Sequence, residues 1–169
     1  HALPLSAPVE IRATASLLEP GLVGIFKPVV LLPRDLLAGL TPAERDGILA
    51  HEVAHWRHRD NLTAALHMLV EALFWFWPPV WLIGARLIAE RERAGDEKVL
   101  GAGFDPGVYA AAILQVCKFC VQSPLACAAG VAGANLARRI ETIMTGTAAR
   151  DLDGGRKLML AGAATLALA

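Results

Sequence analysis

Two histidines and a glutamate have the types and spacing of a metal-dependent hydrolytic site. The segment TPAERDGILAHEVAHWRHRDN contains His51, Glu52 and His55 as a His-Glu-x-x-His motif. In a helix, residues four apart lie about 40° from each other around the axis, so both imidazoles can bind one ion. Glu52 beside them can take a proton from an attacking water and pass it to a leaving amine. The pattern is typical of zinc peptidases and predicts a zinc (Zn2+) site.

The same motif can also arise by chance on an amphipathic helix, where it has no catalytic meaning. Here its neighbours are apolar nearly all round the helix: Ile48, Leu49, Ala50, Val53 and Ala54. We therefore expect the two histidines and the glutamate to be buried. Each buried polar group without a partner costs about 1–3 kcal/mol, and a bound metal removes that cost. The apolar surroundings favour a metal site.

The helix that carries the motif has clear start signals. Thr41 is a suitable N-cap, Pro42 suits the first helical position, and Glu44 completes a capping box. We predict a helix from Pro42 to about His58.

The next segment predicts a helical hairpin. The apolar run from Leu62 to Ile88 is long enough for one transmembrane helix, but Pro78-Pro79 interrupts it and it contains ionisable side chains. Two antiparallel helices explain both features. The aromatic residues Phe74 to Trp77 either pack in the core or lie at a membrane interface, and we favour the interface.

Glu92 is the predicted third metal ligand. An antiparallel return after the prolines brings it close to the end of the motif helix, where a third ligand is needed. Glu92 and Asp96 are four residues apart on one helical face. Glu92 can therefore bind the metal while Asp96 hydrogen-bonds a ligating histidine. Without the upstream motif, the segment ERERAGDEK would indicate an ordinary surface helix.

The segment before the motif predicts a small antiparallel sheet. Val9 to Thr14 alternates apolar and polar residues, and Leu22 to Phe26 and Val29 to Leu32 are short apolar runs. An edge strand near the metal helix can accept an extended peptide as one more strand. We place that substrate contact at Gly24-Ile25-Phe26. A capped edge without a ligand is the alternative.

Composition excludes some partners. The chain has 169 residues with 16 basic and 16 acidic ones, so no strong field favours nucleic acid, and we expect no direct contact with it. The three cysteines, Cys117, Cys120 and Cys127, are odd in number and suit a reducing compartment. Buried thiols explain Cys117 and Cys120 better than a second metal site does.

Five segments resemble the BlaR/MecR-type membrane metallopeptidases, which are bacterial sensor-transducers with a gluzincin domain between transmembrane helices. The segments are GIFKPVVLLP, LTPAERDGILAHEVAHWRHRDN, ALFWFWPPVWL, ERERAGDEKVL and ARRIETIM, and they cover about residues 20 to 146. The resemblance implies a mainly helical α+β fold of the zincin (minigluzincin) type. It also implies zinc held by His51, His55 and Glu92, with Glu52 as general base and Asp96 as the support of a ligand.

A looser likeness to membrane-bound heat-shock and prenyl-protein peptidases suggests Arg139 as a transition-state stabiliser. The chain departs from the family pattern at Gly95, where cysteine is common, and we expect no sensor domain within these 169 residues. The resemblance implies a protein substrate, such as a transcriptional repressor or the protein itself. Two alternatives are a non-catalytic, metal-stabilised signalling or scaffold module and a non-peptidase metallohydrolase. Glu52 argues against the scaffold, because a structural site has no use for a base.

We expect residues 1–155 to form the zinc metallopeptidase domain and residues 156–169 to begin a transmembrane helix. Leu158 to Ala169 carries no charge, and basic residues precede it. Basic flanks lie on the cytoplasmic side, so the domain is expected at the inner membrane, attached by its flanking segments and facing the cytoplasm. A mean hydropathy of +0.46 is high for a soluble protein.

Overall fold

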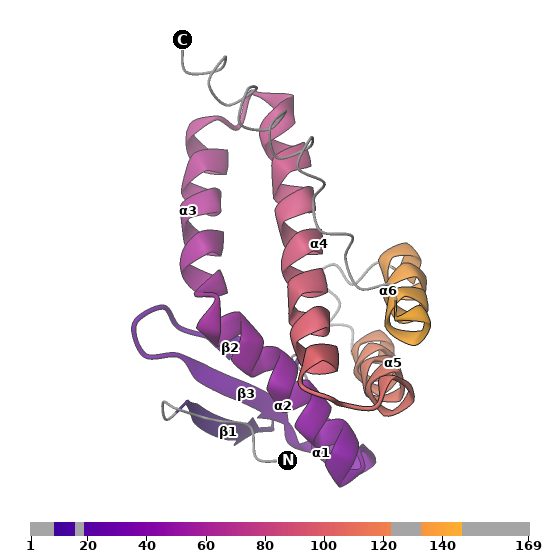
Figure 1. Ribbon diagram of the computed structural model, residues 1–169. Coiled ribbons are helices and arrows are strands. Elements are labelled where there is room, and N and C mark those ends of the chain that lie inside the picture. Colours follow the sequence, from indigo (N-terminus) through magenta and orange to yellow (C-terminus); the bar gives the residue numbers. More distant parts are fainter. Residues whose placement is uncertain (1–8, 16–18, 123–132, 147–169) are drawn as a thin grey trace.

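The computed structural model describes residues 9–15, 19–122 and 133–146, and these residues are mainly helical (Figure 1). A small sheet is formed by β1 (Glu10–Thr14), β2 (Gly21–Val23) and β3 (Val29–Pro33). The helices that follow are α1 (Arg34–Gly39), α2 (Pro42–Arg57), α3 (Asp60–Leu73), α4 (Pro78–Gly101), α5 (Pro106–Gln122) and α6 (Gly133–Thr145). The predicted fold class, mainly helical α+β with a small sheet before the motif helix, is confirmed.

The sheet is mixed, so the prediction of an antiparallel sheet is wrong in this respect. The strand order is β1-β3-β2; β2 pairs antiparallel with β3, and β1 pairs parallel with β3. The chain reverses once after β1 and again after β2, so β1 and β3 run in the same direction. Because β3 takes the middle position, its pairing with β1 has to be parallel. The apolar pattern alone does not show which strand lies in the middle.

The second strand is shorter than predicted. It ends at Val23, and Gly24, Ile25 and Phe26 lie in the turn that leads to β3. Gly24 has a φ of 94°, and a Cβ there would lie 2.7 Å from the Lys27 carbonyl oxygen. Only glycine fits this close approach, which bends the chain out of the strand.

The motif helix α2 lies between two clusters of buried side chains. One joins β3, α1, α2 and α5 and consists of Val30, Leu32, Leu36, Leu40, Ile48 and Ala112. The other joins α2, α4, α5 and α6 and consists of Ala50, Val99, Tyr109, Ala110, Ile113 and Ile143. Burial on both sides explains why α2 is apolar nearly all round. It also removes the motif residues from solvent.

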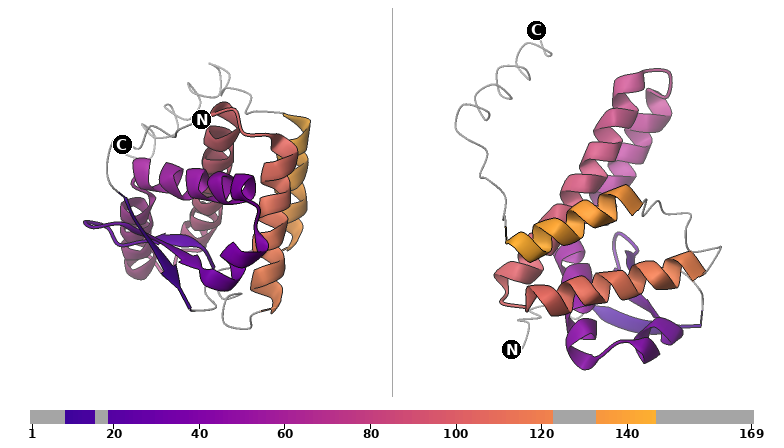
Figure 2. Two further views of the ribbon diagram at one scale, coloured as in Figure 1. Left: turned by 90° about the horizontal axis from the view of Figure 1, so that it is seen from below. Right: turned by 90° about the vertical axis from the view of Figure 1, so that its right-hand side faces the viewer.

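The hairpin predicted around Pro78-Pro79 is confirmed. Helix α3 and the first half of α4 run side by side and project away from the sheet (Figures 1 and 2). We call residues 60–89 the arm. The second half of α4 returns to α2, so the single helix α4 runs from the arm into the segment of the predicted third ligand. Each helix of the described ranges is too short or too polar to cross a bilayer.

The aromatic residues at the tip of the arm do not pack in a core. Phe74, Trp75, Phe76 and Trp77 are between 47% and 68% exposed. This excludes the core alternative and leaves the membrane interface as the prediction.

Helix α6 begins at Gly133. The predicted domain end at residue 155 and the apolar segment after it lie outside the described residues.

The capping box at the start of α2 yields a stability prediction. The Thr41 hydroxyl accepts from the Glu44 backbone N–H at 3.3 Å, and the Glu44 carboxylate accepts from the Thr41 N–H at 2.7 Å. Thr41→Ala should lower the free energy of unfolding by about 1 kcal/mol in urea titrations. Thr63→Ala, on the exposed side of α3, should change it by less than about 0.5 kcal/mol. Equal effects of both variants would show that the box does not stabilise the fold.

Candidate metal centre

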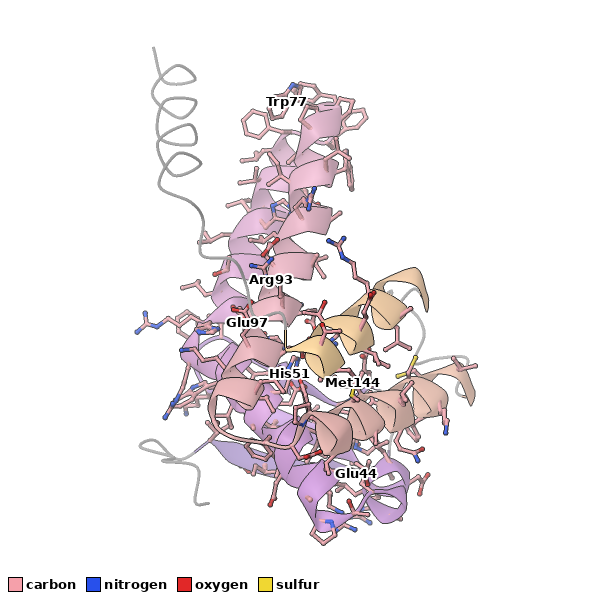
Figure 3. The ribbon with its side chains drawn as sticks, turned by 45° about the vertical axis from the view of Figure 1, so that its right-hand side comes forward. Glu44, His51, Trp77, Arg93, Glu97 and Met144 are labelled. Atoms are coloured by element: carbon pink, nitrogen blue, oxygen red, sulfur yellow. The ribbon has the colours of Figure 1, made fainter. Side chains whose placement is uncertain are left out.

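Three predicted ligands converge from α2 and α4. The Nε2 atoms of His51 and His55 are 3.0 Å apart. Glu92 Oε2 lies 3.4 Å from His51 Nε2, and Glu92 Oε1 lies 3.7 Å from His55 Nε2. One ligand atom of each residue lies within 4.8 Å of the other two, so the group can hold a metal ion. His51 is found where α2, α4 and α6 meet (Figure 3).

The spacing of these atoms fits a small tetrahedral ion. With metal–ligand bonds of about 2.0 Å, two ligands of a tetrahedral zinc are separated by about 3.3 Å. The observed separations run from 3.0 to 3.7 Å. Three protein ligands also leave a fourth position open, as in catalytic sites rather than structural ones.

The other ring nitrogens of the two histidines are held by buried polar groups. His55 Nδ1 lies 2.6 Å from Asp60 Oδ2. His51 Nδ1 lies 2.8 Å from the Tyr109 hydroxyl, which donates to Asp96 Oδ1 at 2.6 Å. Both Nδ1 atoms therefore act as donors, which leaves Nε2 of each ring as the nitrogen that can bind a metal. Arg139 Nη2 also lies 3.3 Å from His51 Nε2.

The electrostatics keep the ligands in the forms that bind metals. Burial, together with the charge of His51, lowers the pKa of His55 and favours its neutral ring. Burial alone would raise the pKa of Glu92, but its contact with the His51 ring and the positive charge of Arg139 lower it to about 2. Glu92 is therefore an anionic donor.

Asp60 reaches His55 because the turn between α2 and α3 is very tight. Arg59 adopts the left-handed conformation with a φ of 56°, and α3 begins at the next residue. This reversal returns the Asp60 side chain to the ring five residues earlier. Sequence reasoning assigned Asp60 no role at the site, although an acidic residue shortly after the motif was an available signal. Tyr109, the single tyrosine of the chain, was also missed.

Glu52 is buried beside the ligands, with only 7% of its surface exposed. Burial is the main reason why its pKa rises to about 7; the charge of His51 opposes this rise, and that of Glu92 adds to it. Such a carboxyl can exchange a proton near neutral pH. Glu19, just before β2, belongs to the same electrostatic environment, because burial and the charge of Glu92 raise its pKa. Sequence reasoning did not identify Glu19.

Arg139 is brought to the site by α6, and its partners are the site carboxylates and the His51 ring. Its Nε and Nη2 donate to the two Asp96 oxygens at 2.6 and 2.7 Å, and its Nη1 donates to Glu92 Oε2 at 3.1 Å. Burial lowers the pKa of Arg139, but the hydrogen bonds and charge of Asp96 outweigh it and keep the guanidinium charged. Asp96 lies 3.4 Å from His51 Nδ1 and reaches that ring mainly through Tyr109.

The predicted substrate residues Gly24, Ile25 and Phe26 lie in the turn after β2. Phe26 is 95% exposed in the turn after β2. The Asn61 side-chain amide donates to the carbonyl oxygens of Leu22 at 3.0 Å and Gly24 at 2.7 Å. Asn61, directly after Asp60, therefore ties the end of β2 to the start of α3. The structure thus anchors the edge strand next to the element that supports His55.

Gly95 provides the space for the His51 ring. A Cβ on Gly95 would lie 2.6 Å from His51 Cε1 and 2.8 Å from Nδ1. Gly95→Ala should displace the ring and lower zinc affinity by roughly 10-fold or more, because the ring orientation sets the ligand geometry. Competition with a chromophoric chelator measures this. Gly101→Ala, near the end of the same helix with no neighbour within 4 Å of the new Cβ, is the matched control. Unchanged affinity in Gly95→Ala would contradict the packing of His51 on Gly95.

Comparison with known proteins finds similar sequences. A family model described as BlaR1 peptidase M56 matches residues 1–143. The regulatory protein BlaR1 of Bacillus licheniformis is 30% identical over 82 residues, which are 48% of this chain and 14% of that protein. The methicillin resistance mecR1 protein of Staphylococcus aureus is 23% identical over 92 residues, which are 54% of this chain and 16% of that protein. The match therefore spans a small part of each relative. Because the family model covers most of the sequence, the chain belongs to the BlaR1 peptidase M56 family.

Proposed function

We propose that this chain is the zinc-dependent endopeptidase domain of a membrane-bound signalling protease. The observation that carries the proposal is the convergence of His51, His55 and Glu92 next to the buried carboxyl of Glu52. A ligand set with an open position beside a carboxyl whose pKa is about 7 suits hydrolysis better than a purely structural role.

Each side chain has a distinct task in this proposal. Zinc, when bound, supplies polarisation of the scissile carbonyl and acidification of water. The Glu52 carboxylate accepts the proton of the attacking water and delivers it to the leaving amine. Asp60 and Tyr109 orient the rings of His55 and His51 through their Nδ1 atoms.

Arg139 has a supporting task that its contacts favour. It donates two hydrogen bonds to the Asp96 carboxylate and one to the Glu92 carboxylate, and so holds both in place. The sequence-based suggestion that Arg139 also stabilises a transition state stays a prediction.

The proposed substrate is a protein, for example a transcriptional repressor or the protein itself. This rests on membership of the family and on the names of the matched relatives, a regulatory protein and a resistance protein. We further propose that the domain works at the cytoplasmic face of the inner membrane, held there by flanking segments. We propose Gly24, Ile25 and Phe26 as substrate contacts next to the edge strand β2, which Asn61 anchors.

A direct experiment tests the proposal. The chain is loaded with zinc, its metal content is measured, and cleavage of an unfolded protein substrate, a candidate repressor and the chain itself is followed with and without a chelator. About one zinc per chain and chelator-sensitive cleavage are expected. Stoichiometric zinc without cleavage of any substrate would instead support the scaffold alternative.

Asp60 allows a sharper prediction within the site. Asp60→Asn replaces the charged partner of His55 Nδ1 by a neutral one, so zinc affinity or activity should fall by about 10- to 100-fold. Asp46→Asn, an exposed acid on α2, should leave both unchanged. Zinc titration and peptide cleavage give the two readouts. Equal behaviour of the two variants would show that Asp60 does not orient His55.

A further inference from the structure

The arm carries most of the exposed large hydrophobic side chains of the described chain. The surfaces of soluble proteins rarely present contiguous apolar patches of this kind, and such patches mark contact with a partner or a membrane. The distribution of the side chains decides which of the two fits.

The apolar surface surrounds the arm instead of following one stripe. On α3, the consecutive residues Met68, Leu69 and Val70 are all exposed, and on α4 the same holds for the three residues from Trp81 to Ile83. Consecutive helical residues point about 100° apart around the axis. Each triplet therefore covers most of the side of its helix that faces away from the other helix of the arm. A partner protein or a second copy covers one face of such a hairpin. Lipid covers all of it.

Two ionisable groups of the arm, His67 and Glu71, are turned toward each other, whereas Arg86 on α4 is exposed. His67 Nε2 lies 3.1 Å from Glu71 Oε1, and both side chains are largely shielded. They fit between the helices because Gly84 faces them: a Cβ there would overlap His67 Nε2 and lie 2.6 Å from Glu71 Oε1. Pairing inside the hairpin is the arrangement by which polar groups are tolerated in hydrocarbon.

The base of the arm carries basic residues. Arg57, His58 and Arg59 precede α3 and are exposed. Such residues meet anionic headgroups when an adjacent apolar segment enters the membrane. The 14 residues of α3 measure about 21 Å at 1.5 Å per residue, which is less than a hydrocarbon core of about 30 Å. The arm is therefore long enough to enter a bilayer and too short to cross it.

We propose that the arm is a lipid-inserted hairpin that enters one side of a bilayer tip first. Trp75, Trp77 and Trp81 then contact lipid, and the basic residues 57–59 lie at the headgroups. An apolar hollow of about 450 Å³ near the tip, lined among others by Phe74, Trp77 and Val80, provides room for an acyl chain. Because α4 continues from the arm to Glu92, insertion also holds the ligand cluster close to the membrane surface. This attachment is separate from the flanking segments and does not depend on catalysis.

Tryptophan fluorescence tests this insertion residue by residue. Four variants each keep one tryptophan, at position 56, 75, 77 or 81, with the others changed to phenylalanine, and circular dichroism checks their fold. They are mixed with vesicles of phosphatidylcholine and phosphatidylglycerol with brominated acyl chains. The three arm tryptophans should be quenched at least about 2-fold relative to unbrominated vesicles, whereas Trp56 on α2 should not. Equal quenching of Trp56, or none in the arm, would overturn the proposal.

A charge substitution at the tip provides the matched control. The variant that retains Trp81 already carries Trp75→Phe, and Phe76→Glu is added to it. The lipid concentration needed for half-maximal quenching of Trp81 should then rise by roughly 10-fold, because a buried charge opposes insertion. Phe26→Glu makes the same change at an exposed aromatic residue outside the arm and should have no effect. Light scattering without lipid reports self-association. If the chain forms dimers that shield the arm tryptophans and vesicles leave them unquenched, a second copy is the occupant and the proposal fails.

Discussion

Glu52→Gln should lower the rate of peptide cleavage by about 10²-fold or more while zinc content and fold stay unchanged. Glutamine keeps the size of the side chain and much of its hydrogen bonding but cannot accept the proton of the attacking water. Glu52 is not part of the group that offers ligand atoms, so its loss leaves the metal in place. Peptide cleavage by zinc-loaded protein and zinc content per chain are the measurements.

The control for Glu52→Gln is Glu90→Gln, an exposed acid on α4 that pairs with Arg93. It should retain full activity. Unchanged activity in Glu52→Gln would exclude Glu52 as the base. Loss of zinc in this variant would instead show that Glu52 is a ligand, and the ligand assignment would have to be revised.

Glu92→Gln and His51→Ala should fail in a different way, through loss of metal. Without the Glu92 carboxylate, two neutral imidazoles remain, and Arg139 loses a partner at 3.1 Å. We expect zinc affinity to fall first and activity with it, with partial recovery in excess zinc. His51→Ala removes one imidazole and should lose zinc outright. Asp96→Asn should weaken zinc binding more than Glu52→Gln does and less than Glu92→Gln does. We expect a loss of about 10- to 100-fold in affinity or activity, because Asp96 acts through Tyr109.

Zinc titration and peptide cleavage on the same preparations separate these cases. If His51→Ala and Glu92→Gln both keep stoichiometric zinc, the proposed ligand set is wrong. If Glu92→Gln keeps zinc and loses activity while Glu52→Gln loses zinc, the two glutamates have exchanged roles. Either result would overturn the proposed site without affecting the lipid insertion of the arm, which is read from fluorescence.

Several elements of the fold could be predicted because their causes are local. The capping box of Thr41 and Glu44 starts α2 within one helical turn, and the helical period places His51 and His55 on one face. The prolines at 78 and 79 interrupt the apolar run and start α4. From these local rules it follows that α4 returns toward α2, and this is why Glu92 could be predicted near the two histidines.

Tertiary structure decided the features that depend on residues far apart in the sequence. Tyr109 lies 58 positions after the His51 ring that it contacts, and Arg139 lies 43 positions after Asp96. No helical period or capping rule relates such pairs, since their contact depends on how α5 and α6 pack on α4. The central place of β3 in the sheet likewise depends on pairing between strands, which the alternation within one strand does not specify. The sequence by itself therefore determined which side chains can perform the chemistry, and the packing of α2, α4, α5 and α6 decided which partners hold them.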